Sequence, residues 1–140
     1  MPAAMYAALF FTVALLVTTA YFLLGSVPLL VLKHDTPRDS QFVRGFFNIY
    51  YRAATLTAGA TSLSYALAGR AGFALGAAAL ALLAIFLRGQ VIGKMDLHRA
   101  SMQADDVDAI PGFRRTHVIA ILINLLQLAV VVWSLTKLSL

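Results

Sequence analysis

The sequence predicts an all-α integral membrane protein, built as an up-down bundle of four transmembrane helices. Four long apolar runs cover about residues 3–32, 46–67, 71–92 and 118–135, each close to the roughly 20 residues that a helix needs to cross a bilayer. Hydrophobic residues make up 61% of the 140-residue chain and charged residues only 12%, as a surface in contact with lipid requires. The links between the runs are short, so we expect a single membrane domain over residues 1–140.

The charged residues predict how this bundle is oriented. Every acidic residue and histidine, and every Lys and Arg except Arg70 and Lys137, lies in or beside one of two links, between runs one and two or between runs three and four. By the positive-inside rule these links face the cytoplasm, and both termini lie on the outer, periplasmic side. We therefore expect a multi-pass protein of the inner membrane. Its basic charge predicts contact with lipid headgroups and not with nucleic acid, because the cations form no continuous basic run.

The first run ends at a predicted helix boundary, and the second helix has a clear start signal. Pro28 removes a backbone donor, so we expect a helix end or a kink next to it. Thr36 suits an N-cap and Pro37 suits the first helical position, with Asp39 three residues after the cap. The second helix is therefore expected to begin at Pro37.

The second and third runs differ in polarity. The second run is rich in Thr, Ser and Tyr, whose hydroxyl groups can bond to the backbone of their own helix. In the third run Gly72 and Gly76 have the small-xxx-small spacing that permits close helix approach, within the bundle or in a homo-oligomer. We expect the third helix to continue to about Gln103, and Ile110-Pro111-Gly112 to reset the chain before the fourth span.

Two arginines are candidate ligand-binding residues. Arg52 and Arg88 each lie a turn or two inside an apolar run, near its cytoplasmic end, and no Asp or Glu lies inside any run. They can extend toward lipid phosphates, or line a cytoplasm-facing cavity that binds an anion or a carbonyl group. Asn48 lies one helical turn before Arg52 and shares its face.

The fourth run contributes His117, Asn124 and Gln127. His117 and Asn124 are seven residues apart and share a helix face, with Asn124 about 10 Å deeper. Such polar side chains must find partners inside the bundle. They could fix helix packing, or they could form a polar pocket in which His117 acts as an acid, base or ligand.

Few cofactors are compatible with this composition. Cysteine is absent, which excludes disulfides, thiolate metal sites and iron–sulfur clusters. His34 lies just after the first run and His117 just before the fourth, and two such histidines could hold a haem iron from both sides. No other metal site is predicted, and the sequence requires no cofactor.

The entrance of the fourth run resembles that of known membrane families. Phe113-Arg114-Arg115-Thr116-His117, followed by Ile123-Asn124-Leu125-Leu126-Gln127-Leu128, resembles the last helix of small bacterial four-helix inner-membrane families, including the anthrone-oxygenase-like group. The resemblance covers about the last 30 residues. It implies that His117 and Asn124 are the functional residues and that a polycyclic phenolic substrate is acted on.

These observations leave three functions open. The first is a binding or accessory protein, in which Asn48, Arg52, Arg88 and the fourth-run polar residues form a cytoplasm-facing pocket for a lipophilic, partly anionic molecule, or contact a larger membrane complex. The second is an oxygenase or isomerase of a lipophilic aromatic, with His117 as catalytic base. The third is a haem-bearing redox subunit that uses His34 and His117.

Overall fold

The protein is a bundle of long helices, with no strand among the residues described. The computed structural model describes residues 2–138. Three elements are continuous α-helices, namely α1 (Pro2–Ser26), α2 (Pro37–Leu67) and α5 (Ala109–Thr136). The remaining long rod consists of α3 (Ala71–Leu87), a π-helical turn η2 (Arg88–Ile92) and α4 (Gly93–Gln103). A short 3₁₀ helix, η1 (Pro28–Val31), follows α1. The predicted all-α class is therefore confirmed.

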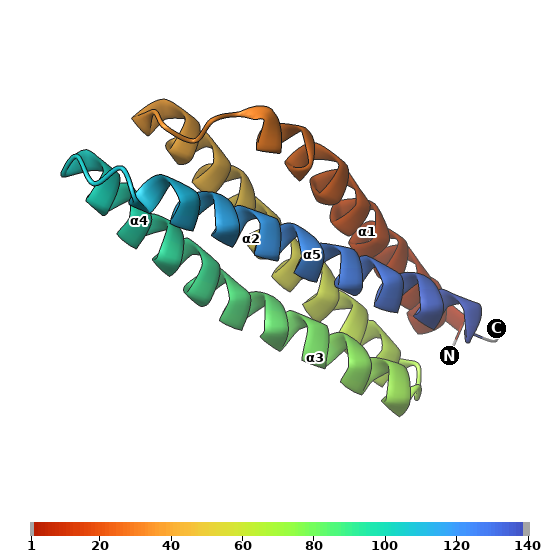
Figure 1. The fold of residues 1–140 in the computed structure, drawn as a ribbon. Coiled ribbons are helices and arrows are strands. Elements are labelled where there is room, and N and C mark those ends of the chain that lie inside the picture. Colours follow the sequence, from red (N-terminus) through yellow and green to blue (C-terminus); the bar gives the residue numbers. More distant parts are fainter. Residues whose placement is uncertain (1, 139–140) are drawn as a thin grey trace.

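The four rods alternate in direction, so that both ends of the chain lie at the same end of the bundle (Figure 1). We call this the terminal end and the opposite one the charged end. Helix α1 packs against α2 and α5, α2 packs against α3, and α4 packs against α5. By contrast, α3 and α5 barely touch, and they diverge toward the terminal end (Figure 1).

Three of the four rods are long and apolar enough to cross a membrane: Ala3–Val31, Ala71–Gln103 and Ala109–Thr136. Helix α2 is long enough, with 31 residues, but its polar side chains exclude it from this set. Three of the four expected spans are thus supported by length and hydropathy. That α2, the second of the expected spans, crosses the membrane stays a prediction.

Local sequence signals around the first link act as expected. Helix α1 ends at Ser26, just before Pro28. Helix α2 begins at Pro37, and the Thr36 hydroxyl accepts a hydrogen bond of 3.2 Å from the Asp39 backbone N–H. The third helix also persists to Gln103 as expected.

The start of α5 differs from the prediction. The chain does not reset at Ile110-Pro111-Gly112, because α5 already begins at Ala109. Pro111 fits in the first turn, where backbone N–H groups have no helical partner to lose. Gly112 leaves room for the ring of His98 on α4, because a Cβ at this position would lie 2.5 Å from Cε1 of that ring.

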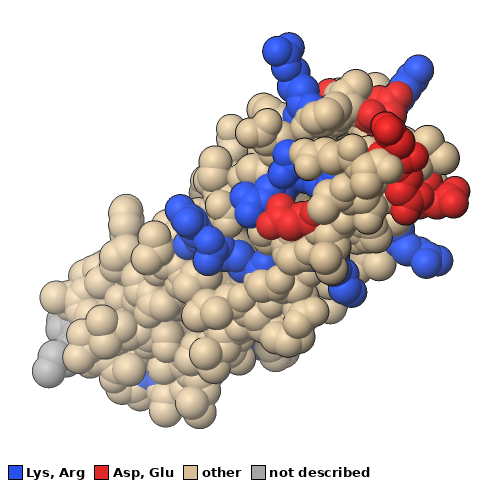
Figure 2. Space-filling model, turned by 90° about the vertical axis from the view of Figure 1, so that its left-hand side faces the viewer, with Lys and Arg blue, Asp and Glu red and all other residues tan. Residues whose placement is uncertain are grey.

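The core is dense at the charged end and thin at the terminal end. The main cluster contains large side chains, including Phe47, Tyr50, Tyr51, Met95 and Phe113, all almost fully buried. A much smaller cluster around Leu15, Ala58 and Val131 lies further toward the terminal end. Charge follows the same division, since acidic and basic side chains gather at one end and the other is almost uncharged on the face shown in Figure 2.

Candidate functional site

Two buried histidines meet where α1 ends and α5 begins. His34 lies in the link before α2 and His117 lies in α5, and neither exposes any surface. Nε2 of His34 is 2.9 Å from Nδ1 of His117. Nε2 of His117 is 3.1 Å from the carbonyl oxygen of Ser26, the last residue of α1. His34 adopts a left-handed backbone conformation, with φ of 61°, which turns its ring into the bundle.

The partners of these rings determine the direction of their hydrogen bonds. A carbonyl oxygen only accepts, so Nε2 of His117 carries the proton and donates to Ser26. Nδ1 of a neutral His117 then accepts from the Nε2–H of His34. The remaining nitrogen of His34, Nδ1, faces Nη1 of Arg114 at 3.4 Å, and guanidinium groups only donate. Every ring nitrogen therefore has a partner when both histidines are neutral.

Arg114 holds the same segment from outside. Its Nη1 donates to the Leu32 carbonyl at 2.9 Å and its Nη2 to the Leu30 carbonyl at 2.6 Å. These bonds satisfy carbonyl groups at the end of η1, which have no helical partner. Burial lowers the pKa of His34, and the Arg114 cation lowers it further. Both effects favour the neutral ring.

This histidine pair does not fit a shared iron. Bonds from a metal to imidazole nitrogens are about 2 Å long, so two axial nitrogens would stand roughly 4 Å apart. Here the facing nitrogens of His34 and His117 are 2.9 Å apart and bonded to each other. Within residues 2–138, no group of three or more His, Cys, Asp or Glu residues is arranged to hold a metal ion. We therefore do not carry the haem interpretation forward.

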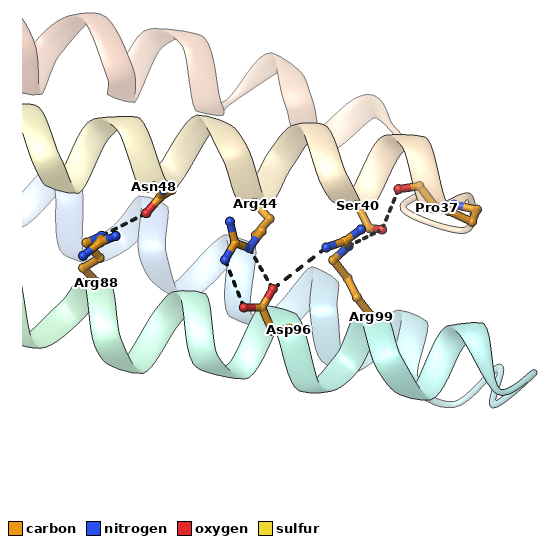
Figure 3. Close-up of polar contacts among 7 residues, drawn as sticks. All are labelled: Pro37, Ser40, Arg44, Asn48, Arg88, Asp96 and Arg99. Atoms are coloured by element: carbon orange, nitrogen blue, oxygen red, sulfur yellow. Dashed lines mark hydrogen bonds and ion pairs between the residues drawn. The ribbon is translucent and has the colours of Figure 1, made fainter.

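A second polar feature joins α2 to the α3–α4 rod, and we call it the polar ladder. Its rungs are three hydrogen-bonded pairs, drawn in Figure 3: Ser40–Arg99 at 3.2 Å, Arg44–Asp96 at 2.7 and 3.1 Å, and Asn48–Arg88 at 2.9 Å. Asp96 also lies 3.9 Å from Arg99. On α2 the rungs are four residues apart, which places them along one side of the helix.

The π turn brings the other half of this ladder into register. In a regular α-helix, Arg88 and Asp96 would differ by about 80° around the axis, because eight residues make more than two turns. The extra residue in η2 removes most of that difference, so both side chains reach α2. Arg52, one turn beyond Asn48, is exposed and forms no hydrogen bond or ion pair with the described residues.

The deeper polar residues of α5 are buried but have different environments. Gln127 accepts a hydrogen bond of 2.7 Å from the Tyr50 hydroxyl. Asn124 is 1% exposed, and neither atom of its amide group has a hydrogen-bond partner among the described residues. Buried amides without partners are uncommon in native proteins.

The sequence-predicted site residues thus divide into separate places. Asn48 and Arg88 are bonded to each other, with Arg52 one turn away on the α2 surface. His117 is bonded to His34, and Gln127 to Tyr50. Two of the contacts had no signal in the sequence. The Ser26 carbonyl accepts from His117, and Arg114 donates to the Leu32 carbonyl, and each pair is more than 80 positions apart in the chain.

An apolar groove opens between α3 and α5 in the terminal half, where these helices diverge. Its volume is about 290 Å³, and Leu15 of α1 and Tyr65 of α2 lie along it. Its walls include Gly72, Gly76 and Leu80 of α3, Val131 and Trp133 of α5, and Lys137 just after α5. Within 4 Å of a Cβ built at Gly72 or Gly76 there is no atom, so these glycines leave space and do not mediate close helix packing within the chain. Their spacing was the only sequence signal for this region.

The inner end of the groove approaches the buried Tyr50–Gln127 pair. Leu15, Leu80 and Val131 line the groove and also a small cavity of about 10 Å³ beside Tyr50 and Gln127. The groove therefore runs from Lys137 toward the middle of the bundle. None of the six residues predicted to form a site lines the groove itself.

Comparisons with known proteins add no relative: no family model, curated protein or solved structure matches this chain. The resemblance of the α5 entrance to small four-helix membrane families therefore stays a resemblance.

Proposed function

We propose that this chain is a small membrane protein that binds a lipophilic, partly anionic molecule, namely an amphiphile with a hydrocarbon chain and an anionic head. The observation that carries the proposal is the apolar groove between α3 and α5. The hydrocarbon chain lies in the groove, and the head lies at its outer end beside Lys137.

The length of the groove suits this occupant. From Gly72 to Leu80 the α3 wall is about 12 Å long, which is close to half of the roughly 30 Å hydrocarbon thickness of a bilayer. A chain that enters sideways from one leaflet therefore fits the groove without crossing the membrane midplane. The walls are mainly apolar along this length, with the hydroxyl-bearing Thr12, Thr61 and Tyr65 among them, and apolar contacts supply most of the affinity in such sites.

Charge and composition at the outer end support an anionic head. Lys137 carries the only charge among the residues that line the groove, and Ser134 lies one turn before it. Trp133 also lines the groove, and tryptophan is typical of the membrane–water interface. A carboxylate or phosphate beside Lys137 would thus have a cation, a hydroxyl group and water.

This proposal places the apolar part of the ligand at the opposite end from the pocket expected from sequence. It keeps the predicted topology, in which all four rods cross the inner membrane, the charged end faces the cytoplasm and the terminal end faces outward. In such a bundle α2 has α1 and α3 on either side, which shields part of its polar surface from lipid.

The geometry favours binding over an acid–base reaction at His117. That ring is fully buried, and both of its nitrogens are occupied by His34 and Ser26. A general base must come within hydrogen-bond distance of the proton that it removes. We therefore do not propose the oxygenase or isomerase as the function.

The single tryptophan of the chain provides a direct test. A fatty acid brominated along its chain, titrated into the purified protein, is expected to quench Trp133 fluorescence with saturation. Gly76→Leu fills the groove without a clash at its Cβ and is expected to weaken binding about tenfold, equivalent to about 1.4 kcal/mol. The matched control is Ala79→Leu, which adds the same bulk to an exposed position of α3 that does not line the groove.

Two results would contradict the proposal. Equal quenching curves for Gly76→Leu, Ala79→Leu and the unmodified chain would show that the groove is not the binding site. Equal affinity for the brominated fatty acid and the corresponding alcohol, unchanged by Lys137→Gln, would remove the anionic head from the proposal.

A further inference from the structure

The polar ladder has more positive than negative charge, and the excess lies at its inner end. The cations Arg44 and Arg99 share the carboxylate of Asp96. Among residues 2–138, Arg88, one rung further in, is paired only with the neutral amide of Asn48. Arg52 continues the same side of α2 by one more turn and has no partner among the described residues. In Figure 2, blue side chains accordingly extend further toward the uncharged half than red ones do.

Arg88 contacts α2 at Asn48, and Arg52 lies one helical turn from that contact. Asn48 and Arg52 are neighbours on one face of α2, with Cβ atoms about 5–6 Å apart. The amide oxygen of Asn48 accepts from Nε of Arg88, which fixes that guanidinium beside α2, and neither of its Nη groups has a partner among the described residues. Arg88 is half-buried and Arg52 is exposed, so a ligand can reach both from the surface.

We propose that Arg52 and Arg88 bind the phosphate of an anionic phospholipid, positioned by Asn48. Guanidinium groups match phosphate oxygens with paired, charge-assisted hydrogen bonds, which lysine cannot reproduce. This phosphate site lies at the charged end, and its chemistry does not depend on the apolar groove.

The surroundings favour a lipid over free phosphate. Ile49 and Leu56 on α2, and Ile85 and Phe86 on α3, are all at least half exposed around the arginine pair. Such side chains offer an apolar surface for acyl chains beside the bound headgroup. Arg52 also lies eight residues, about 12 Å, further along α2 than Arg44, toward the uncharged half of the bundle. In the predicted topology this is the direction of the hydrocarbon layer.

The experiment measures which lipids the purified full-length protein retains. The protein is incubated with equal amounts of phosphatidylglycerol and phosphatidylcholine in detergent, and bound lipids are counted by native mass spectrometry. We expect preferential retention of the anionic lipid, reduced roughly tenfold in Arg52→Leu and in Arg88→Leu. Arg52→Lys is expected to restore only part of the preference, because an ammonium group is a point charge.

The matched control is Arg115→Leu, which removes the same charge from an exposed residue at the same end that lies outside the polar ladder. We expect it to leave the lipid preference unchanged. If Arg115→Leu and Arg52→Leu reduced the preference for the anionic lipid equally, only net charge would matter and the proposed site would be wrong. Displacement of phosphatidylglycerol by inorganic phosphate would overturn the lipid as the ligand.

A folding defect cannot imitate the expected result in every variant. Arg88→Leu breaks the rung to Asn48 and could weaken the bundle, but Arg52 contacts no described residue through hydrogen bonds or ion pairs. Arg52→Leu should therefore keep the unmodified thermal stability while losing lipid. Retained lipid preference in a stable Arg52→Leu protein would refute the proposal.

Discussion

At the residue scale, the histidine pair shows how buried polar groups are satisfied inside this bundle. Arg114 donates toward His34, His34 donates to His117, and His117 donates to the Ser26 carbonyl. Each neutral ring uses one nitrogen as donor and the other as acceptor. An additional proton on His34 would turn its Nδ1 into a donor that faces the Arg114 cation.

This arrangement predicts acid sensitivity. The pKa of His34 is lowered by burial and by Arg114, so the unfolded chain takes up a proton more readily than the folded one. The contribution of His34 to stability is therefore complete above the unfolded pKa of about 6.5 and is lost as the pH falls below that value. Thermal unfolding in detergent should show a lower midpoint at pH 5.5 than at pH 7.5.

The matched variant is His34→Asn. Asparagine accepts the left-handed backbone conformation of position 34 but does not titrate. We expect this variant to be less stable at pH 7.5 and to show a smaller difference between the two pH values. A pH dependence as large as that of the unmodified chain would assign the effect to other groups.

At the element scale, sequence predicts helices well and their contacts poorly. The apolar runs, the Thr36 cap and the continuation of the third helix to Gln103 could be predicted, because each depends on residues close together in the sequence. The π turn could not, because the contacts that it aligns, those of Arg88 and Asp96 with α2, join residues 40 and 52 positions apart. The His34–His117 pair and the groove likewise depend on how distant helices pack.

The π turn leads to a prediction about a deletion. Removing Gly89 should convert η2 into regular α-helix while Arg88 and Asp96 keep their relation to α2, because the turn holds one residue more than an α-helix needs. Gly89 is exposed, and no atom lies within 4 Å of a Cβ built on it. We expect the deletion to leave the thermal midpoint within a few degrees of the unmodified value.

The reference for this measurement is Asp96→Asn, which weakens the ion pair with Arg44. If deleting Gly89 lowers the thermal midpoint more than Asp96→Asn does, the π turn has a role beyond aligning the polar ladder. The coupling between Arg44 and Asp96, measured by a double-mutant cycle, should be the same with and without Gly89.

At the scale of the whole molecule, the two ends of the bundle differ in packing as well as charge. The charged end has the large aromatic core and the polar ladder, whereas the terminal end has the groove and a small apolar cluster. The sequence predicted the division of charge but placed the candidate pocket at the charged end. Four of the six predicted residues are bonded to other side chains, Asn48 to Arg88, His117 to His34 and Gln127 to Tyr50, and these pairings depend on how distant helices pack.

The orientation of the bundle can be tested because the chain has no cysteine. Gln103→Cys at the charged end and Ala71→Cys at the terminal end both introduce a thiol at an exposed position. In intact cells a membrane-impermeant reagent should label Ala71→Cys and not Gln103→Cys, and permeabilisation should expose both. The reverse pattern would invert the orientation. Labelling of both positions in intact cells would place them on the same side of the membrane and contradict a single crossing between Ala71 and Gln103.

The Arg114 and His117 contacts also bear on the order in which the protein is made. The carbonyl groups of Ser26, Leu30 and Leu32 bond to α5 side chains that are 91, 84 and 82 residues later in the chain. During synthesis, these carbonyl groups therefore emerge long before their partners exist. The contacts at the far end of the first helix can therefore form only after the last helix has been translated.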